Sequence, residues 1–171
     1  MKYEELKNDF REQILCTLND FSTTEQNRNV YAIVFDCDLE NGQIVLRYSN
    51  LENFESLKQS WKKYKYMYEP YGQNGLFGLK YNSVGGYYGE DKPINVIEIS
   101  GQTLEGDNLR TEIENIFIRM IIDTISEIKD MLGIINYDDD YLVFMCDHDI
   151  SNDDFEKWVR KTNDDKLVVF L

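Results

Sequence analysis

The chain has 171 residues, of which 42% are hydrophobic, 13% aromatic and 29% charged, and its formal net charge is −14. This length predicts a single domain over residues 1–171 with an ordinary hydrophobic core. The apolar and aromatic content excludes an intrinsically disordered chain, and no apolar run approaches the length of a membrane span. Three widely separated cysteines (Cys16, Cys37 and Cys146) and an N-terminus without signal-peptide features predict a soluble, cytoplasmic protein.

The charge balance bears on the class of partner. Lys and Arg number 18 against 32 Asp and Glu. Such a chain repels phosphate backbones and anionic lipid, so we expect neither a nucleic-acid partner nor a membrane partner. A basic protein is the partner class that this charge favours.

The N-terminal third predicts a helix followed by a β-hairpin. Val30–Phe35 and Gln43–Tyr48 flank Asn41-Gly42, the strongest short signal for a type I′ turn between two strands. Before them, apolar residues at spacings of three and four predict a helix of about five turns. These residues are Tyr3, Leu6, Phe10, Ile14, Leu18 and Phe21.

The middle of the chain changes character twice. A helix from about Leu51 to Tyr64 is expected, with Asn50 as its N-cap. Residues 64–89 then hold seven of the twelve tyrosines and six of the ten glycines, which predicts a long aromatic excursion rather than a regular element. Pro93–Ile99 alternates loosely and predicts a strand.

The C-terminal part supplies the clearest element, a helix over Asp107–Leu132 with Asp107 as N-cap and Gly133 as its end. A buried strand (Tyr141–Cys146), a short helix (Ile150–Lys161) and a terminal strand (Leu167–Leu171) are expected to follow. The whole pattern predicts an α+β domain with an antiparallel sheet packed against the N-terminal helix and the long central helix. The stripe expected to face the core is Leu109, Ile113, Ile116, Phe117, Met120, Ile121, Ile125, Ile128, Met131 and Leu132.

One segment begins like a calcium-binding loop, with acids at its first, third and fifth positions, Asp36, Asp38 and Glu40. The match then breaks, because Asn41 replaces the glycine of the sharp turn and Arg47 replaces the bidentate glutamate at position twelve. We therefore interpret these acids as flanking a hairpin turn.

The only histidine lies in Cys146-Asp147-His148-Asp149. A catalytic histidine needs a nucleophile or an orienting group that this spacing does not supply, and no Cys-x-x-Cys or His-x-x-x-His pair indicates zinc. We predict no catalytic residue, no metal and no cofactor, and a protein that is not an enzyme. The alternative that stays open is an enzyme with an unrecognised site around Cys146, Asp147 and His148.

Surface features are the remaining candidates for function. Residues 136–165 contain ten acids against three bases, which predicts either plain solubility charge on loops and a helix N-terminus or an electronegative docking face. The tyrosine-rich segment is a second candidate, since its rings either cover the core or anchor a partner. The candidate partner-binding residues are Asp138, Asp139, Asp140, Asp147, Asp149, Asp153, Asp154, Tyr66, Tyr68 and Tyr71.

The order of these pieces resembles a family group. Its marks are the strand Val30–Asp36 with its mate ending Arg47–Asn50, then Trp61, Gly78–Tyr81, the long apolar helix, and Tyr141–Phe144 followed by Asp147. Together they resemble small cytoplasmic bacterial proteins that accompany polymorphic toxins as immunity proteins, of the SUKH-like or a similar type. The resemblance implies non-enzymatic inhibition, in which a stable domain binds one toxin domain, often a nuclease, and masks its active site.

The resemblance and the charge agree on one hypothesis. A toxin domain that attacks nucleic acid presents cationic surface, and an acidic protein can occupy that surface. We therefore expect an immunity-type protein, monomeric or homodimeric, that neutralises a cognate toxin domain by occlusion. A homo-oligomeric structural or regulatory domain, built through exposed aromatic residues, is a further alternative.

Overall fold

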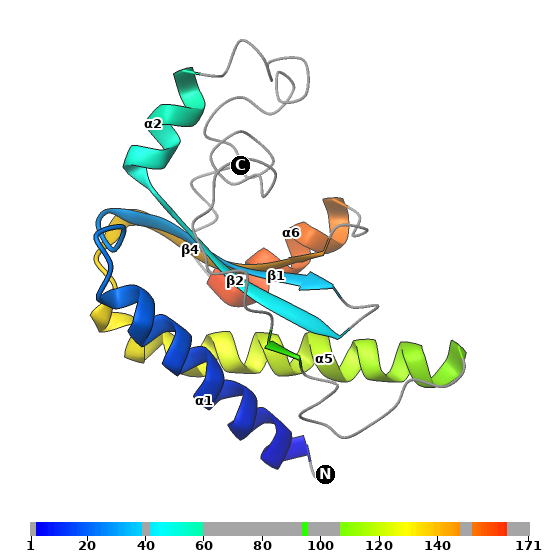
Figure 1. Ribbon diagram of the computed structural model, residues 1–171. Helices are drawn as coiled ribbons and strands as arrows, with labels where there is room; N and C mark the ends of the chain where they lie inside the picture. The colour runs from blue at the N-terminus through cyan, green and yellow to red at the C-terminus, as the bar shows by residue number, and fades with distance from the viewer. Residues whose placement is uncertain (1–2, 39–41, 60–93, 96–106, 148–151, 164–171) are drawn as a thin grey trace.

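The computed structural model describes residues 3–38, 42–59, 94–95, 107–147 and 152–163, and within them the expected α+β class is confirmed (Figure 1). No helix in these ranges is long and apolar enough to cross a membrane. The tyrosine-rich segment 64–89 and the terminal strand expected at 167–171 lie outside the described residues. In chain order the elements are α1 (Tyr3–Ser22), β1 (Val30–Asp38), β2 (Gln43–Asn50), α2 (Leu51–Gln59), β3 (Ile94–Asn95), α5 (Asp107–Ile128), the 3-10 helix η1 (Lys129–Ile134), β4 (Tyr137–Asp147) and α6 (Asn152–Asn163).

The described strands form one sheet in the order β3-β2-β1-β4. β1 pairs with β2 antiparallel, as the hairpin prediction requires, and β2 pairs with β3 antiparallel. β1 pairs with β4 in parallel, so the expectation of a wholly antiparallel sheet was wrong on this point. The physical reason is the connection, because a long crossover that includes α5 leads the chain back to begin β4 at the same end as β1.

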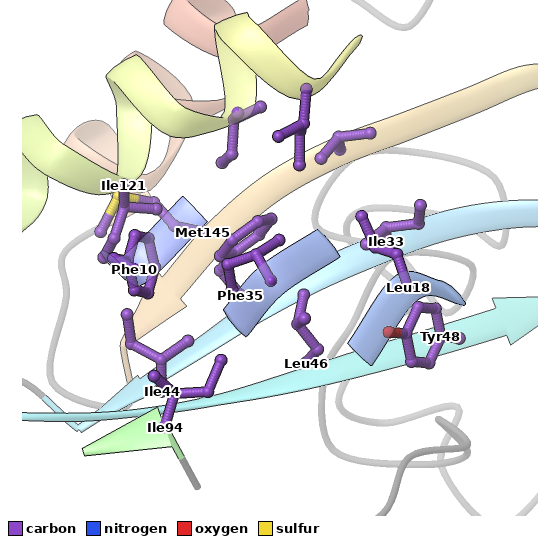
Figure 2. Packing of buried hydrophobic residues seen from close by; sticks show 14 of the residues in the cluster. Phe10, Leu18, Ile33, Phe35, Ile44, Leu46, Tyr48, Ile94, Ile121 and Met145 are labelled. Carbon is purple, nitrogen blue, oxygen red and sulfur yellow. The ribbon is translucent and has the colours of Figure 1, made fainter. Parts of the chain in front are cut away.

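One face of the sheet packs against α1 and α5, which lie side by side below it in Figure 1. Alternate residues of β1 point toward this core: in Figure 2 Phe35 lies beside Phe10 of α1 and Ile121 of α5, and Ile33 lies beside Leu18 of α1. At the far end of this core the ring of Phe21 stacks on that of Tyr48, with centroids 3.7 Å apart. The stripe expected on the first helix is therefore the face that α1 buries, through Phe10, Ile14, Leu18 and Phe21.

β1 and β4 are buried on both faces. Ala32 and Val34 of β1, and Leu142 and Phe144 of β4, alternate with the residues that face α1 and α5, yet they too are fully inaccessible. Parallel strands are usually covered on both sides, which gives them continuous apolar runs rather than alternation. The burial explains why both segments carry such runs in the sequence.

The hairpin and the cap of the second helix follow the prediction, but the register at the turn of the hairpin does not. Asp38 pairs with Gln43, so four residues (39–42) separate the paired strand ends and the register differs from that of a two-residue type I′ turn at Asn41-Gly42, although Gly42 has the left-handed φ of 61°. Asn50 caps α2, because its Oδ1 accepts a hydrogen bond of 2.9 Å from the backbone N–H of Asn53. The predicted extension of this helix beyond Gln59 lies outside the described part of the chain.

α5 runs along the core as expected, with two differences. Ile116, placed on the buried stripe by its spacing, is 38% exposed, whereas its neighbour Phe117 is buried. The α-helix ends at Ile128 and continues as a 3-10 turn through Gly133, so that glycine does not mark the end of the α-helix. The tighter turn still buries Leu132 against the core.

Charged and polar side chains join the first turns of α1 to the last turns of α5. The Tyr3 hydroxyl donates to Asp123 at 2.8 Å, and Lys7 Nζ donates to Glu127 at 2.8 Å. Arg11 lies 3.6 Å from the same glutamate. The pairs follow each other in the same order on both helices, so α1 and α5 run roughly parallel at this contact.

The buried face of α5 carries the polar side chain of Thr124. Its hydroxyl is buried and makes no hydrogen bond to any residue that the structure describes. Because a valine methyl fits the same space without a desolvation cost, we expect Thr124→Val to raise the free energy of unfolding by about 1 kcal/mol. Urea denaturation measures this, with Thr17→Val as control, since the Thr17 hydroxyl is exposed and bonds to the Gln13 carbonyl. A lower stability for Thr124→Val would contradict the expectation.

Candidate functional site

The acidic triplet of the sequence lies in a bulge of β4. Tyr137 pairs with Val30 and Leu142 pairs with Ala32, so one residue of β1 is opposed by four residues of β4. Three extra residues must therefore bulge from the ladder. Asp138–Asp140 belong to this stretch, with Asp139 exposed and Asp138 half-buried. The triplet was expected on a loop, but the structure places it within the strand, at the start of β4.

Two tyrosines flank the bulge. The rings of Tyr137 and Tyr141 stack with centroids 4.2 Å apart and an interplanar angle of 14°. Both rings pack against the hydrophobic core, and burial raises the pKa of Tyr137. The stack holds the two ends of the bulge close together. We call Asp138–Asp140 the acidic bulge.

Asparagine side chains fix the chain that leads into the bulge. The Asn136 backbone N–H donates to Asn27 Oδ1 at 2.8 Å, and the Asn136 side chain donates to the Asn27 carbonyl at 2.9 Å. Asn27 Nδ2 donates in turn to the carbonyls of Ser22 and Ile134. The start of β4 is thereby fastened to the end of α1, and the acidic bulge stands on a rigid base.

The other aspartate of β4 lies far from the acidic bulge. Asp147 pairs with Cys37 of β1, six residues beyond Tyr31, the residue that the bulge opposes, which corresponds to about 20 Å along the sheet. Charges this far apart are largely screened from each other at physiological salt, where the Debye length is about 8 Å. Asp147 therefore does not share one charged surface with the acidic bulge.

α6 carries the next acids along the described chain. Asp153 and Asp154 occupy its first turn, where carboxylates favour the helix dipole. Lys157 pairs with Asp154 at 2.9 Å and Arg160 pairs with Glu156 at 2.6 Å. The helix carries three acids and three bases, so its net charge is zero. β4, by contrast, carries four aspartates and no base.

The remaining predicted contact residues cannot be placed. Asp149, Tyr66, Tyr68 and Tyr71 lie outside the described residues, and the side chain of Asp140 is not described although its backbone belongs to the bulge. Within the acidic bulge the side chains of Asp138 and Asp139 are described, and the strand that holds them contains no basic residue. The acidic bulge is the leading candidate for a contact surface.

A second cluster lies near the carboxyl ends of β1 and β4. Asp36 pairs with Arg47 of β2 at 3.1 Å and accepts the thiol of Cys146 at 3.8 Å. Arg47 is the residue that breaks the calcium-loop pattern, and here it neutralises the first acid of that pattern. Within the described ranges no three His, Cys, Asp or Glu side chains are placed to hold a metal ion. His148 lies outside those ranges.

Sequence reasoning missed the bulge and the contact of Asp36 with Cys146, because both depend on the parallel pairing of β1 and β4. The available signal for the bulge was the segment Tyr137-Asp-Asp-Asp-Tyr141, in which two aromatic residues flank three aspartates. Rings four residues apart in a strand can stack only if the chain between them is not extended.

Comparison of the chain with protein-family models, with curated proteins and with solved structures returned no match.

Proposed function

We propose that the protein is a cytoplasmic, immunity-type binding protein that neutralises a cognate toxin domain by occluding its basic surface. The observation that supports the proposal best is the acidic bulge, which presents adjacent aspartates on a rigid base without a basic residue in the same strand. Concentrated negative charge steers a cationic partner toward one orientation and speeds its association. The contact then covers cationic groups that the toxin needs to bind the phosphates of nucleic acid.

The balanced charges of α6 make this helix a weaker candidate for the proposed contact than the acidic bulge. Its acids are matched by bases on the same helix, and two of the acids are engaged in ion pairs. Surface pairs of this kind leave little charge for a partner. We therefore assign the leading role to the acidic bulge, and a secondary one to Asp153, the acid of the first turn that faces solvent.

The test compares two variants with the same change in net charge. The first is Asp138→Lys with Asp139→Lys in the acidic bulge, and the second is Asp9→Lys with Glu12→Lys on the exposed side of α1. Each variant is immobilised, exposed to lysate of the native cell and eluted with rising salt, and the retained protein is identified by mass. The isolated partner is then used to measure association rates.

We expect the bulge variant to slow association roughly tenfold or more and to flatten its salt dependence, because the steering charge is reversed. The α1 variant should bind as the unmodified protein does. Equal effects of the two variants would show that only net charge matters, and unchanged binding of the bulge variant would contradict the proposed contact. Thermal unfolding of both variants verifies that each is folded.

A second candidate function, an enzyme, rests on the carboxyl ends of the parallel pair. Ligand sites of parallel sheets lie at this edge, and Cys146 and Asp147 stand there. His148→Ala separates the two functions, since neutralisation of a toxin by occlusion survives this change. An enzyme that depends on Cys146, Asp147 and His148 loses its activity.

A further inference from the structure

We draw no further inference here: the strongest candidate, the side-chain cluster of Asp36, Arg47 and Cys146 near the carboxyl ends of β1 and β4, consists of groups that bond to one another, and nothing in the described part of the chain indicates which ligand they would take.

Discussion

Replacement of Asn163 by alanine is expected to lower the free energy of unfolding by about 3 kcal/mol. β4 is the outermost strand of the described sheet, and the Asn163 carboxamide pairs with it as a neighbouring strand would. Its Oδ1 accepts from the N–H of Val143 at 2.9 Å, and its Nδ2 donates to the carbonyl of the same residue at 2.7 Å. The alanine variant leaves both backbone groups buried without these bonds, and each such loss costs about 1 to 3 kcal/mol.

Denaturant unfolding measures this loss, and an isosteric variant tests its cause. In Asn163→Asp a carboxylate oxygen replaces Nδ2 and faces the carbonyls of Val143 and Val159, which both accept hydrogen bonds in the native protein. Burial against these oxygens raises the pKa of the new carboxyl above its unfolded value. Its stability deficit is therefore largest at neutral pH and shrinks as the pH falls toward about 4. A deficit independent of pH would contradict this account of the contact.

Local sequence signals predicted the elements of the fold well. The stripe of α1, the Asn-Gly hairpin and the Asn50 cap each depend on residues close together in the chain, and each is confirmed. The helix expected at Ile150–Lys161 is found at Asn152–Asn163, a shift of two residues. The expected burial of Val159 on it is confirmed.

The pairing of strands that lie far apart in the sequence could not be predicted from such local signals. The periodicity of a strand shows which residues alternate, but it does not show whether the neighbouring strand is parallel. The strand expected at Tyr141–Cys146 is longer, because Asp138–Asp140 interrupt the apolar pattern without ending the strand. Asp36 of β1 likewise bonds to Arg47 of β2 and to Cys146 of β4. Only the sheet brings these three strands together.

This difference matters for the candidate site. Composition identified residues 136–165 as acidic, but it does not show which of these acids lie close together in the folded protein. The parallel ladder places Asp147 about 20 Å from the acidic bulge, and ion pairs on α6 engage Asp154 and Glu156. The register of β4 thus separates acids that composition alone groups together.

Stability is expected to fall steeply as the pH rises from about 9 to 12. Four core or seam groups are neutral acids whose pKa is raised by burial: the Cys37 thiol and the hydroxyls of Tyr3, Tyr31 and Tyr48. The pKa of Tyr31 rises from 10.0 to about 12, because desolvation outweighs the hydrogen bond that Ser49 donates to its oxygen. The pKa values of Cys37 and Tyr48 also rise, again chiefly through desolvation.

The direction of this stability change follows from the fact that burial favours the neutral form of each group. A group whose pKa is higher in the folded than in the unfolded state contributes stability that is fully present below the unfolded pKa and is lost as the pH rises toward the folded pKa. The loss therefore begins near pH 9 for the thiol and near pH 10 for the tyrosines. By pH 12 the raised pKa of Tyr31 alone corresponds to a loss of about 2 kcal/mol, a large part of the stability of an ordinary domain.

Tyr48→Phe isolates one contribution to this loss. The Tyr48 hydroxyl is buried and has no hydrogen-bond partner among the described residues, so removing it leaves stability at pH 7 unchanged or slightly raised. The ring still stacks on Phe21, and the variant has one fewer buried acid to ionise. Melting temperatures of both proteins between pH 7 and 12 should therefore diverge above pH 10, with the variant higher. Parallel curves would contradict the assignment, because they would mean that Tyr48 ionises equally in the folded and unfolded chains.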